Sequence, residues 1–352
     1  MAERIRVGVV YGGRSSEHAI SVVSAGSVLS ALDPARYEVV TIGITPSGAW
    51  LPTSVDPREL RIANRQLPSV AEPAGSAVTV FGAGDGTALD RLAGVDVVFP
   101  VLHGANGEDG TIQGLLELAG VPYVGSGVLA SAAAMDKTFT KTVLAAAGLA
   151  VTPCVVARRG RPVRTLDVRH LGLPLFVKPA RTGSSVGISR VERYEDLPEA
   201  LELAFGHDDK VLVEAAMTGR ELECGVLQDA DGTVSASLPA EIRLRPGFDW
   251  YSFDAKYLDD SCDFDIPAQI GEAAVKQVQD VACRAFEALE CSGLARVDGF
   301  WTAAGRFVVN EVNTMPGFTP ISMYPKMWAE TGVDYPELLD RLIATALRRA
   351  GR

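Results

Sequence analysis

Two apolar runs near the C-terminal end of the chain, LARVDGFW and RFVVNEVN, flank a short Ala-Gly turn and predict a β-hairpin. With the hairpin centred on that turn, Asp298 lies opposite Glu311, and Arg296 lies opposite Asn313. Side chains alternate between the two faces of a strand, so these four residues share one face. Carboxylate and amide oxygens are ligands that suit Mg²⁺, whose coordination substrate phosphates usually complete. The hairpin therefore predicts a metal site formed by Asp298, Glu311 and Asn313.

The same hairpin allows an interpretation without a metal. Arg296 carries a positive charge that neutralises facing carboxylates, which would make the strands an ordinary ion-paired hairpin. A shift of the register by one residue would also turn every side chain to the opposite face. The hairpin alone does not decide between the two interpretations.

A second candidate site is the glycine- and serine-rich loop in LFVKPARTGSSVGIS. Lys178 ends the predicted strand before the loop, and another strand begins after Gly187. The chain contains no G-x-x-x-x-G-K-S/T string, which excludes a P-loop. Small residues would nevertheless let backbone N–H groups approach phosphate oxygens, with Lys178 adding a charge. The alternative is a flexible surface hairpin.

A third motif is the G-x-G-x-x-A string from Gly125 to Ala130, which opens the helix containing Lys137. Such a string begins the helix of a dinucleotide-binding unit, and Arg158 and Arg159 at the next strand end would suit NADP. The preceding strand is very short, however, and no acidic residue marks the next strand end. An NADP-binding oxidoreductase is therefore a minor alternative.

The elements that position these motifs change in kind along the chain. The first third alternates strands (IRVGVVYGG, YEVVTIGI, VDVVFPVL) with helices (SEHAISVVSAGSVLSAL, GTIQGLLELAG), which predicts a helix-covered parallel sheet. A weakly patterned surface excursion occupies residues 53–86. One helix over SAAAMDKTFTKTVLAAAG, closed by Gly148, then leads into a small α+β region.

The last third contains strands in ELECGVL and SLPAEIRL, a lid loop in FDWYSFDAKYLDD, the helix EAAVKQVQDVACRAFEAL, the hairpin and the closing helix PELLDRLIATALRR. These elements again predict an α+β region.

The composition of the chain excludes several classes of protein. The chain has 352 residues, 47% of them hydrophobic and 22% charged, as in a globular protein of two or three domains. The formal net charge of −11 argues against a broad nucleic-acid-binding surface. The start lacks a signal-peptide core and a membrane-spanning run, so we expect a cytoplasmic protein without a membrane partner. Five cysteines without a C-x-x-C pair, and four histidines, argue against a disulfide framework and structural zinc.

Five strings together resemble the D-alanine:D-alanine ligases. They are GGRSSEH at residues 12–18, LHGANGEDG at 102–110, MDK at 135–137, VKP with GSSVG at 177–187, and NEVNTMPG at 310–317. The resemblance implies an ATP-grasp fold of the α/β and α+β multidomain class. It implies an N-terminal parallel-sheet, Rossmann-like substrate domain at 1–133, a central subdomain with the phosphate loop at 134–221, and a C-terminal subdomain with the lid and metal site at 222–352.

The resemblance also implies a reaction. One D-alanine carboxylate takes the γ-phosphoryl group of ATP, and the amine of a second D-alanine attacks the acyl phosphate, giving D-alanyl-D-alanine for peptidoglycan synthesis. ATP and Mg²⁺ or Mn²⁺, with two ions per site, are the implied cofactors, and a homodimer is the implied assembly. A related ligase using D-lactate or another second substrate is the alternative, but Tyr257 in the lid favours an amine.

Residue roles follow from the same resemblance. Glu17 would bind the ammonium of the first substrate, and Ser184 and Tyr257 would form a hydrogen-bonded set with Glu17. Arg296 would face the developing oxyanion, and His103 would lie near both substrates. Gly317 and Ser322 would hold the carboxylate of the second substrate. At ATP, Glu214 would contact adenine and Glu221 the ribose. The residues near the phosphates would be Lys137, Lys178, Lys256, Gly183 and Ser185.

Several of these residues have ordinary interpretations when taken singly. Glu17 is typical of a helix first turn, His103 of a structural histidine, and Lys137 and Glu214 of solvated charges. The chain also departs from the family where an acid and a lysine are frequent, at Ala19 and Ala215. Only the joint pattern supports the roles.

Overall fold

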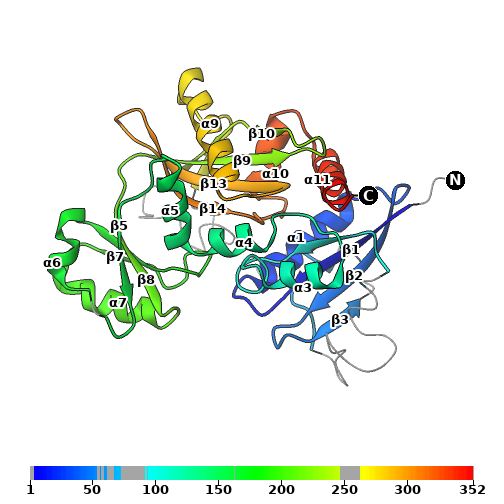
Figure 1. Ribbon diagram of the computed structural model, residues 1–352, viewed down its shortest axis with the longest axis horizontal. Helices are drawn as coiled ribbons and strands as arrows, with labels where there is room; N and C mark the ends of the chain where they lie inside the picture. Colours follow the sequence, from blue (N-terminus) through cyan, green and yellow to red (C-terminus); the bar gives the residue numbers. More distant parts are fainter. Residues whose placement is uncertain are drawn as a thin grey trace.

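The computed structural model describes residues 4–53, 56, 59–61, 67–72, 92, 94–161, 163–245 and 262–351. Three β-sheets carry the fold, and the large sheet lies between the N-terminal sheet and a small sheet at the other end of the long axis (Figure 1). Most of the expected surface excursion, and the expected lid with Lys256 and Tyr257, lie outside the described residues. No helix in the described part of the chain has the length and apolar character needed to cross a membrane.

The N-terminal sheet has the strand order β3-β2-β1-β4. Its strands are β1 (Ile5–Gly12), β2 (Tyr37–Ile44), β3 (Trp50–Thr53) and β4 (Val97–Val101). β1 pairs in parallel with β2 and β4, which confirms the predicted parallel sheet, whereas β3 adds an antiparallel edge that was not predicted. The helices α1 (His18–Ala31) and α3 (Thr111–Ala119) match the predicted ones.

The helix predicted over residues 131–148 is wrong as a single element. The structure has two helices, α4 (Val128–Met135) and α5 (Lys137–Ala146), separated at Asp136. Asp136 is extended, and its carboxylate accepts hydrogen bonds from the backbone of Thr138 and Phe139, as an N-cap does. A buried ion pair with Lys210 fixes the same carboxylate. Asp136 therefore starts the helix that presents Lys137.

The small sheet has the order β5-β8-β6-β7, with all pairs antiparallel. Its elements are β5 (Cys154–Arg158), α6 (Thr165–Val168), β6 (Leu175–Pro179), β7 (Ser189–Val191), α7 (Leu197–Phe205) and β8 (Lys210–Ala215). Apolar residues of α7 share a core with β6 and β8. The loop between β6 and β7 is the glycine- and serine-rich loop, so the predicted hairpin is confirmed.

The large sheet has the order β12-β11-β9-β13-β14, with β10 beside β9. Its strands are β9 (Arg220–Gln228), β10 (Val234–Ala236), β11 (Ala240–Leu244), β12 (Cys262–Asp265), β13 (Leu294–Trp301) and β14 (Phe307–Asn313). The long helix α9 (Glu272–Ala288) packs its apolar face on this sheet. The domain boundaries at 133 and 221 stay predictions, although β9 starts just before the second of them.

Two helices close the chain. α10 (Met323–Glu330) was not predicted, because it is short and contains a proline. The proline lies in the first turn of the helix, where a missing backbone N–H costs little stability. α11 (Tyr335–Arg349) matches the predicted closing helix. Its apolar side chains share one core with β1 and β4, and the Tyr37 hydroxyl donates to Asp340 at 2.6 Å. This packing fixes the N-terminal sheet against the C-terminal part of the chain.

Candidate active site

Two adjoining cavities lie where the three sheets meet. The first, of about 360 Å³, is lined by residues from the N-terminal strand ends, the glycine- and serine-rich loop and the β13/β14 hairpin. The second, of about 700 Å³, lies between the small and large sheets. Both are lined by Lys137, Gly183, Ser184 and Glu311. The predicted sites thus form one continuous region.

The structure brings most of the predicted residues into this region. The first cavity also contains Glu17, His103, Arg296, Asn313, Gly317 and Ser322. The second also contains Lys178, Ser185, Glu214 and Glu221. Asp298 lines neither cavity, because it lies against Arg296.

The β13/β14 hairpin has the predicted register, with Asp298 paired with Glu311 and Arg296 with Asn313. Arg296 donates two hydrogen bonds of 2.7 Å to Asp298, and the Asn313 amide donates a third at 2.9 Å. Lys137 Nζ lies 3.5 Å from a Glu311 oxygen. The ion-paired interpretation therefore describes how Asp298 is held here.

The hairpin also has the donor chemistry of a magnesium site. Asp298, Glu311 and Asn313 offer hard oxygen donors. Each of the two carboxylates contacts a positively charged side chain, Asp298 that of Arg296 and Glu311 that of Lys137. Among the described residues, no three His, Cys, Asp or Glu side chains gather as a metal cluster. Phosphate oxygens would have to complete the coordination, as they usually do for Mg²⁺.

The glycine- and serine-rich loop contacts the start of α1. The Ser184 hydroxyl donates to Glu17, a buried residue just before α1. Ser184 and Ser185 have φ of +48° and +61°, a left-handed conformation that non-glycine residues rarely adopt outside functional sites. A Cβ atom on Gly183 would lie 2.7 Å from a Glu17 oxygen, so a larger residue there would push the Glu17 carboxylate away. Two of the three members of the predicted hydrogen-bonded set are thus joined.

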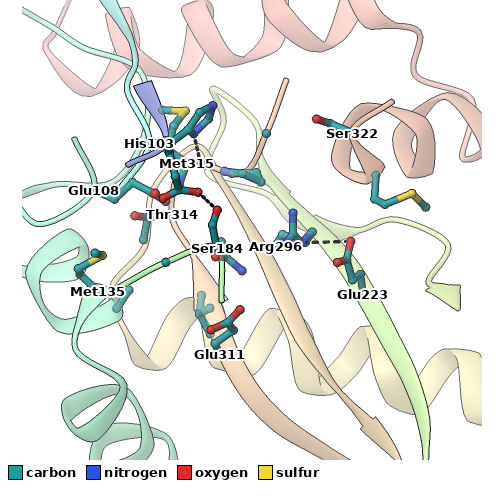
Figure 2. Close-up of a pocket in the computed structure, with 18 of the residues that line it drawn as sticks. His103, Glu108, Met135, Ser184, Glu223, Arg296, Glu311, Thr314, Met315 and Ser322 are labelled. Atoms are coloured by element: carbon teal, nitrogen blue, oxygen red, sulfur yellow. Dashed lines mark hydrogen bonds and ion pairs between the residues drawn. The ribbon is translucent and has the colours of Figure 1, made fainter. Parts of the chain in front are cut away.

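His103 is both a satisfied structural histidine and a cavity residue. Its ring nitrogens lie 3.0 Å from the Ser24 hydroxyl and 3.1 Å from the Met315 carbonyl, and Figure 2 shows it above the hairpin. Burial lowers the pKa of His103, which favours the neutral ring. The histidine therefore joins α1 to the loop after β14.

Glu108 is a cavity residue that sequence reasoning did not single out, although it lies within the GEDG string. Its carboxylate accepts hydrogen bonds from the backbone of Gly104 at 2.7 Å and of Met315 at 3.2 Å. Burial and the charge of Glu17 raise the pKa of Glu108 to about 8. Glu108 therefore links two of the motif loops.

Replacing Glu108 with glutamine should change how stability depends on pH. An acid whose pKa is raised by folding makes the native state less stable as the pH rises from its ordinary range through about 8. The glutamine does not titrate. The midpoint of thermal unfolding of Glu108→Gln, measured relative to that of the wild type, should therefore rise between pH 6 and pH 9. Glu330→Gln, at an exposed position, is the control. A pH-independent difference for Glu108→Gln would contradict the raised pKa.

Glu214 is held between two lysines, and the interpretation of Glu214 and Lys137 as solvated charges is wrong. Glu214 is 3% exposed and Lys137 8%. Lys141 Nζ lies 3.0 Å from one Glu214 oxygen, and Lys178 Nζ lies 2.5 Å from the other. Burial alone would raise the pKa of Glu214, but the two lysines lower it below its ordinary value. Three charges thus form one buried cluster.

Asn310 connects this cluster to the hairpin. Its side-chain oxygen accepts from Lys178 at 3.1 Å, and its backbone oxygen accepts from Lys141 at 3.2 Å. Lys141 was missed at the sequence level, but it follows Lys137 by four residues and so lies one turn further along α5. Both lysines of α5 therefore approach β14.

The second-substrate candidates lie before α10. A Cβ atom on Gly317 would lie 2.6 Å from the Ser322 hydroxyl, so a larger residue there would force that hydroxyl to move. The Ser322 hydroxyl accepts from the backbone of Thr319 at 3.0 Å, and it does not cap α10 itself. A helix start without a side-chain cap favours an anion such as a carboxylate.

The dinucleotide-like string is used for packing. The Gly125 carbonyl accepts a hydrogen bond from Arg349 at 2.7 Å, and a Cβ atom on Gly125 would lie 3.2 Å from the Met315 methyl group. This contact with α11 ties the string to the C-terminal core, which does not favour the oxidoreductase alternative.

Family models match both halves of the chain. The model described as D-ala D-ala ligase N-terminus matches residues 6–126, and the one described as D-ala D-ala ligase C-terminus matches residues 143–344. The chain belongs to the D-alanine:D-alanine ligase family. The resemblance drawn from the five strings is thereby confirmed, and so is the multidomain α/β fold of the ATP-grasp type.

Individual relatives of the family are similar over nearly the whole chain. The D-alanine–D-alanine ligases of Mycolicibacterium vanbaalenii and Nocardia farcinica are each 57% identical, over 99% of this chain and 99% of their own. The structure of the D-alanine-D-alanine ligase from Coxiella burnetii has a TM-score of 0.83 and 36% identity, over 99% of this chain and 96% of its own. The VanG D-Ala:D-Ser ligase from Enterococcus faecalis has a TM-score of 0.81 and 36% identity, over 98% of this chain and 100% of its own.

Proposed function

We propose that this protein joins two D-alanines to D-alanyl-D-alanine, with ATP as the co-substrate, through a D-alanyl phosphate. The observation that carries the proposal is the continuous region in which Glu17 and Ser184 line one cavity with Arg296 and Glu311 of the hairpin. Relatives at 57% identity that carry this name support the choice of substrate. The product fits the synthesis of peptidoglycan precursors.

The first cavity would hold the reacting groups. Glu17, fixed by Ser184, is placed to pair with the ammonium of the first D-alanine. Arg296 would stabilise the oxyanion that forms when the second amine attacks. Gly317, Ser322 and the start of α10 would hold the second carboxylate. Together these residues would align an amine with an acyl phosphate and keep water away from it.

The second cavity would hold ATP. Backbone N–H groups of Gly183 and Ser185, with Lys137 and Lys178, would neutralise the phosphates. Glu214 and Glu221 would lie near adenine and ribose. Asp298, Glu311 and Asn313 would hold Mg²⁺ or Mn²⁺, with two ions per site. The metal would supply charge neutralisation at the transferred phosphoryl group.

The proposal includes three broader properties. We expect a homodimer, a cytoplasmic location, and domains at residues 1–133, 134–221 and 222–352. The family resemblance supports the dimer, and the composition argues for small-molecule substrates rather than nucleic acid.

The first experiment is ADP release from MgATP in the presence of D-alanine, with products identified by mass. L-alanine alone, D-alanine with D-lactate, and D-alanine with D-serine are parallel reactions, the last because one structural relative is named a D-Ala:D-Ser ligase. D-alanine-dependent ADP together with D-alanyl-D-alanine is the expected result. A preferred mixed product would overturn the second substrate, and no ADP in any reaction would overturn the activity.

A further inference from the structure

Arg296 lies between two carboxylates, only one of which belongs to the predicted site. Asp298 is its partner on β13, and Glu223 is the residue of β9 directly opposite Asp298 in the sheet. Arg296 Nε lies 3.2 Å from Glu223, as the dashed line in Figure 2 shows. The Arg296 and Glu223 side chains are only 14% and 5% exposed. A buried guanidinium is thus shared by two buried anions.

This arrangement creates a competition at Asp298. Both Asp298 oxygens accept hydrogen bonds from Arg296, so a metal at Asp298 must share or displace the guanidinium. A buried cation that loses its partner pays a large desolvation penalty. Glu223 lines the first cavity together with Arg296 and contacts the Arg296 side chain, so it offers Arg296 an alternative partner.

We propose that Glu223 is a positioning residue, which holds Arg296 in the first cavity when Asp298 binds a metal ion instead of Arg296. This inference rests on the proposed function, because it requires Asp298 to be a metal ligand. Glu223 acts through Arg296, rather than by touching the substrate or the metal. It would allow Asp298 to exchange partners while the guanidinium stays where the oxyanion forms.

The test is Mn²⁺ binding to the full-length protein with bound AMPPNP, followed by the EPR signal of free Mn²⁺. In Glu223→Gln, Arg296 loses its anionic partner on β9 and holds Asp298 more firmly. The Mn²⁺ dissociation constant should therefore rise roughly tenfold, because the charge of Arg296 is no longer divided between Asp298 and Glu223. In Arg296→Met the competition disappears, and Mn²⁺ should bind more tightly than to the wild type.

The double variant Glu223→Gln/Arg296→Met separates positioning from simple attraction of the metal. If Glu223 acts through Arg296, the double variant binds Mn²⁺ as Arg296→Met does. An equal loss of affinity in both backgrounds would show that Glu223 acts as a negative charge only, and would overturn the inference. Thermal unfolding checks each variant. If Arg296→Met does not fold, Arg296→Gln replaces it, because glutamine also lacks the positive charge that competes for Asp298.

Asp298→Asn distinguishes failure of the inference from failure of the metal assignment. If Asp298→Asn binds Mn²⁺ as the wild type does, the metal site is wrong and the inference falls with it. If Asp298→Asn loses Mn²⁺ but Glu223→Gln does not, only the inference is wrong.

Discussion

Glu311→Gln should lower kcat by about a thousandfold while the protein stays folded, a loss in the range measured when one group that stabilises developing charge is removed. Glutamine keeps the size of Glu311 but removes the charge that would hold a divalent cation. Glu311 lines both cavities, which places it between the substrate and ATP regions. Phosphoryl transfer depends on charge neutralisation more than on covalent help from the protein, so the loss should appear in kcat.

The fold should survive because Glu311 is partly exposed and its pairing with Lys137 is long. Its side chain is 25% exposed, and Lys137 keeps a hydrogen bond of 2.9 Å to the Thr182 carbonyl. Circular dichroism and thermal unfolding would check the fold, and ADP release would measure turnover. Glu38→Gln, which breaks an exposed strand ion pair with Arg6, is the matched control. Retained activity in Glu311→Gln would refute the metal assignment.

The sequence predicts the candidate site best at the β13/β14 hairpin, where the alternation of side chains along a strand decides which residues share a face. The turn in LARVDGFW and RFVVNEVN and the period of two were enough to predict that Asp298 lies opposite Glu311, and the structure has this pair. The strands next to the turn have a different register, with Gly299 opposite Val309, and a bulge between Asp298 and Gly299 shifts it by one residue. Nothing in the sequence signals this bulge. The predicted pairs of Arg296 and Asp298 are therefore present, but they depend on the bulge as well as on the turn.

The sequence does not predict which buried charges share a partner. Lys141, Lys178 and Glu214 lie on three elements, and only the packing of α5 against the small sheet and β14 brings them together. Glu223 lies two residues after Glu221 on β9 and so shares its face of the sheet, but nothing local shows that Glu223 reaches Arg296. Such contacts depend on tertiary packing. The break at Asp136 was different, because an aspartate before a helical run is a local capping signal.

Glu214→Gln should be the most destabilising single change in the ATP region. It leaves Lys141 and Lys178 buried near each other without the anion that they share. Breaking a buried ion pair by removing one partner costs about 3–5 kcal/mol. The pKa of Glu214 is lowered by folding, so its contribution is fully present above its ordinary range and is lost as the pH falls through the lowered value. The difference in unfolding midpoint from the wild type should therefore shrink in acid.

The double variant Glu214→Gln/Lys141→Met shows whether the shared charge is the cause. It removes one anion and one cation together, and Lys178 keeps the Asn310 oxygen as a partner. Deleting a whole buried pair is often close to neutral, so most of the lost stability should return. If the double variant is as unstable as Glu214→Gln, the charge cluster is not the cause. Because the double variant is expected to fold, its KM for ATP then reports the second role of Glu214. A raised KM in a stable protein would support contact with adenine, and an unchanged KM would restrict Glu214 to holding the two lysines.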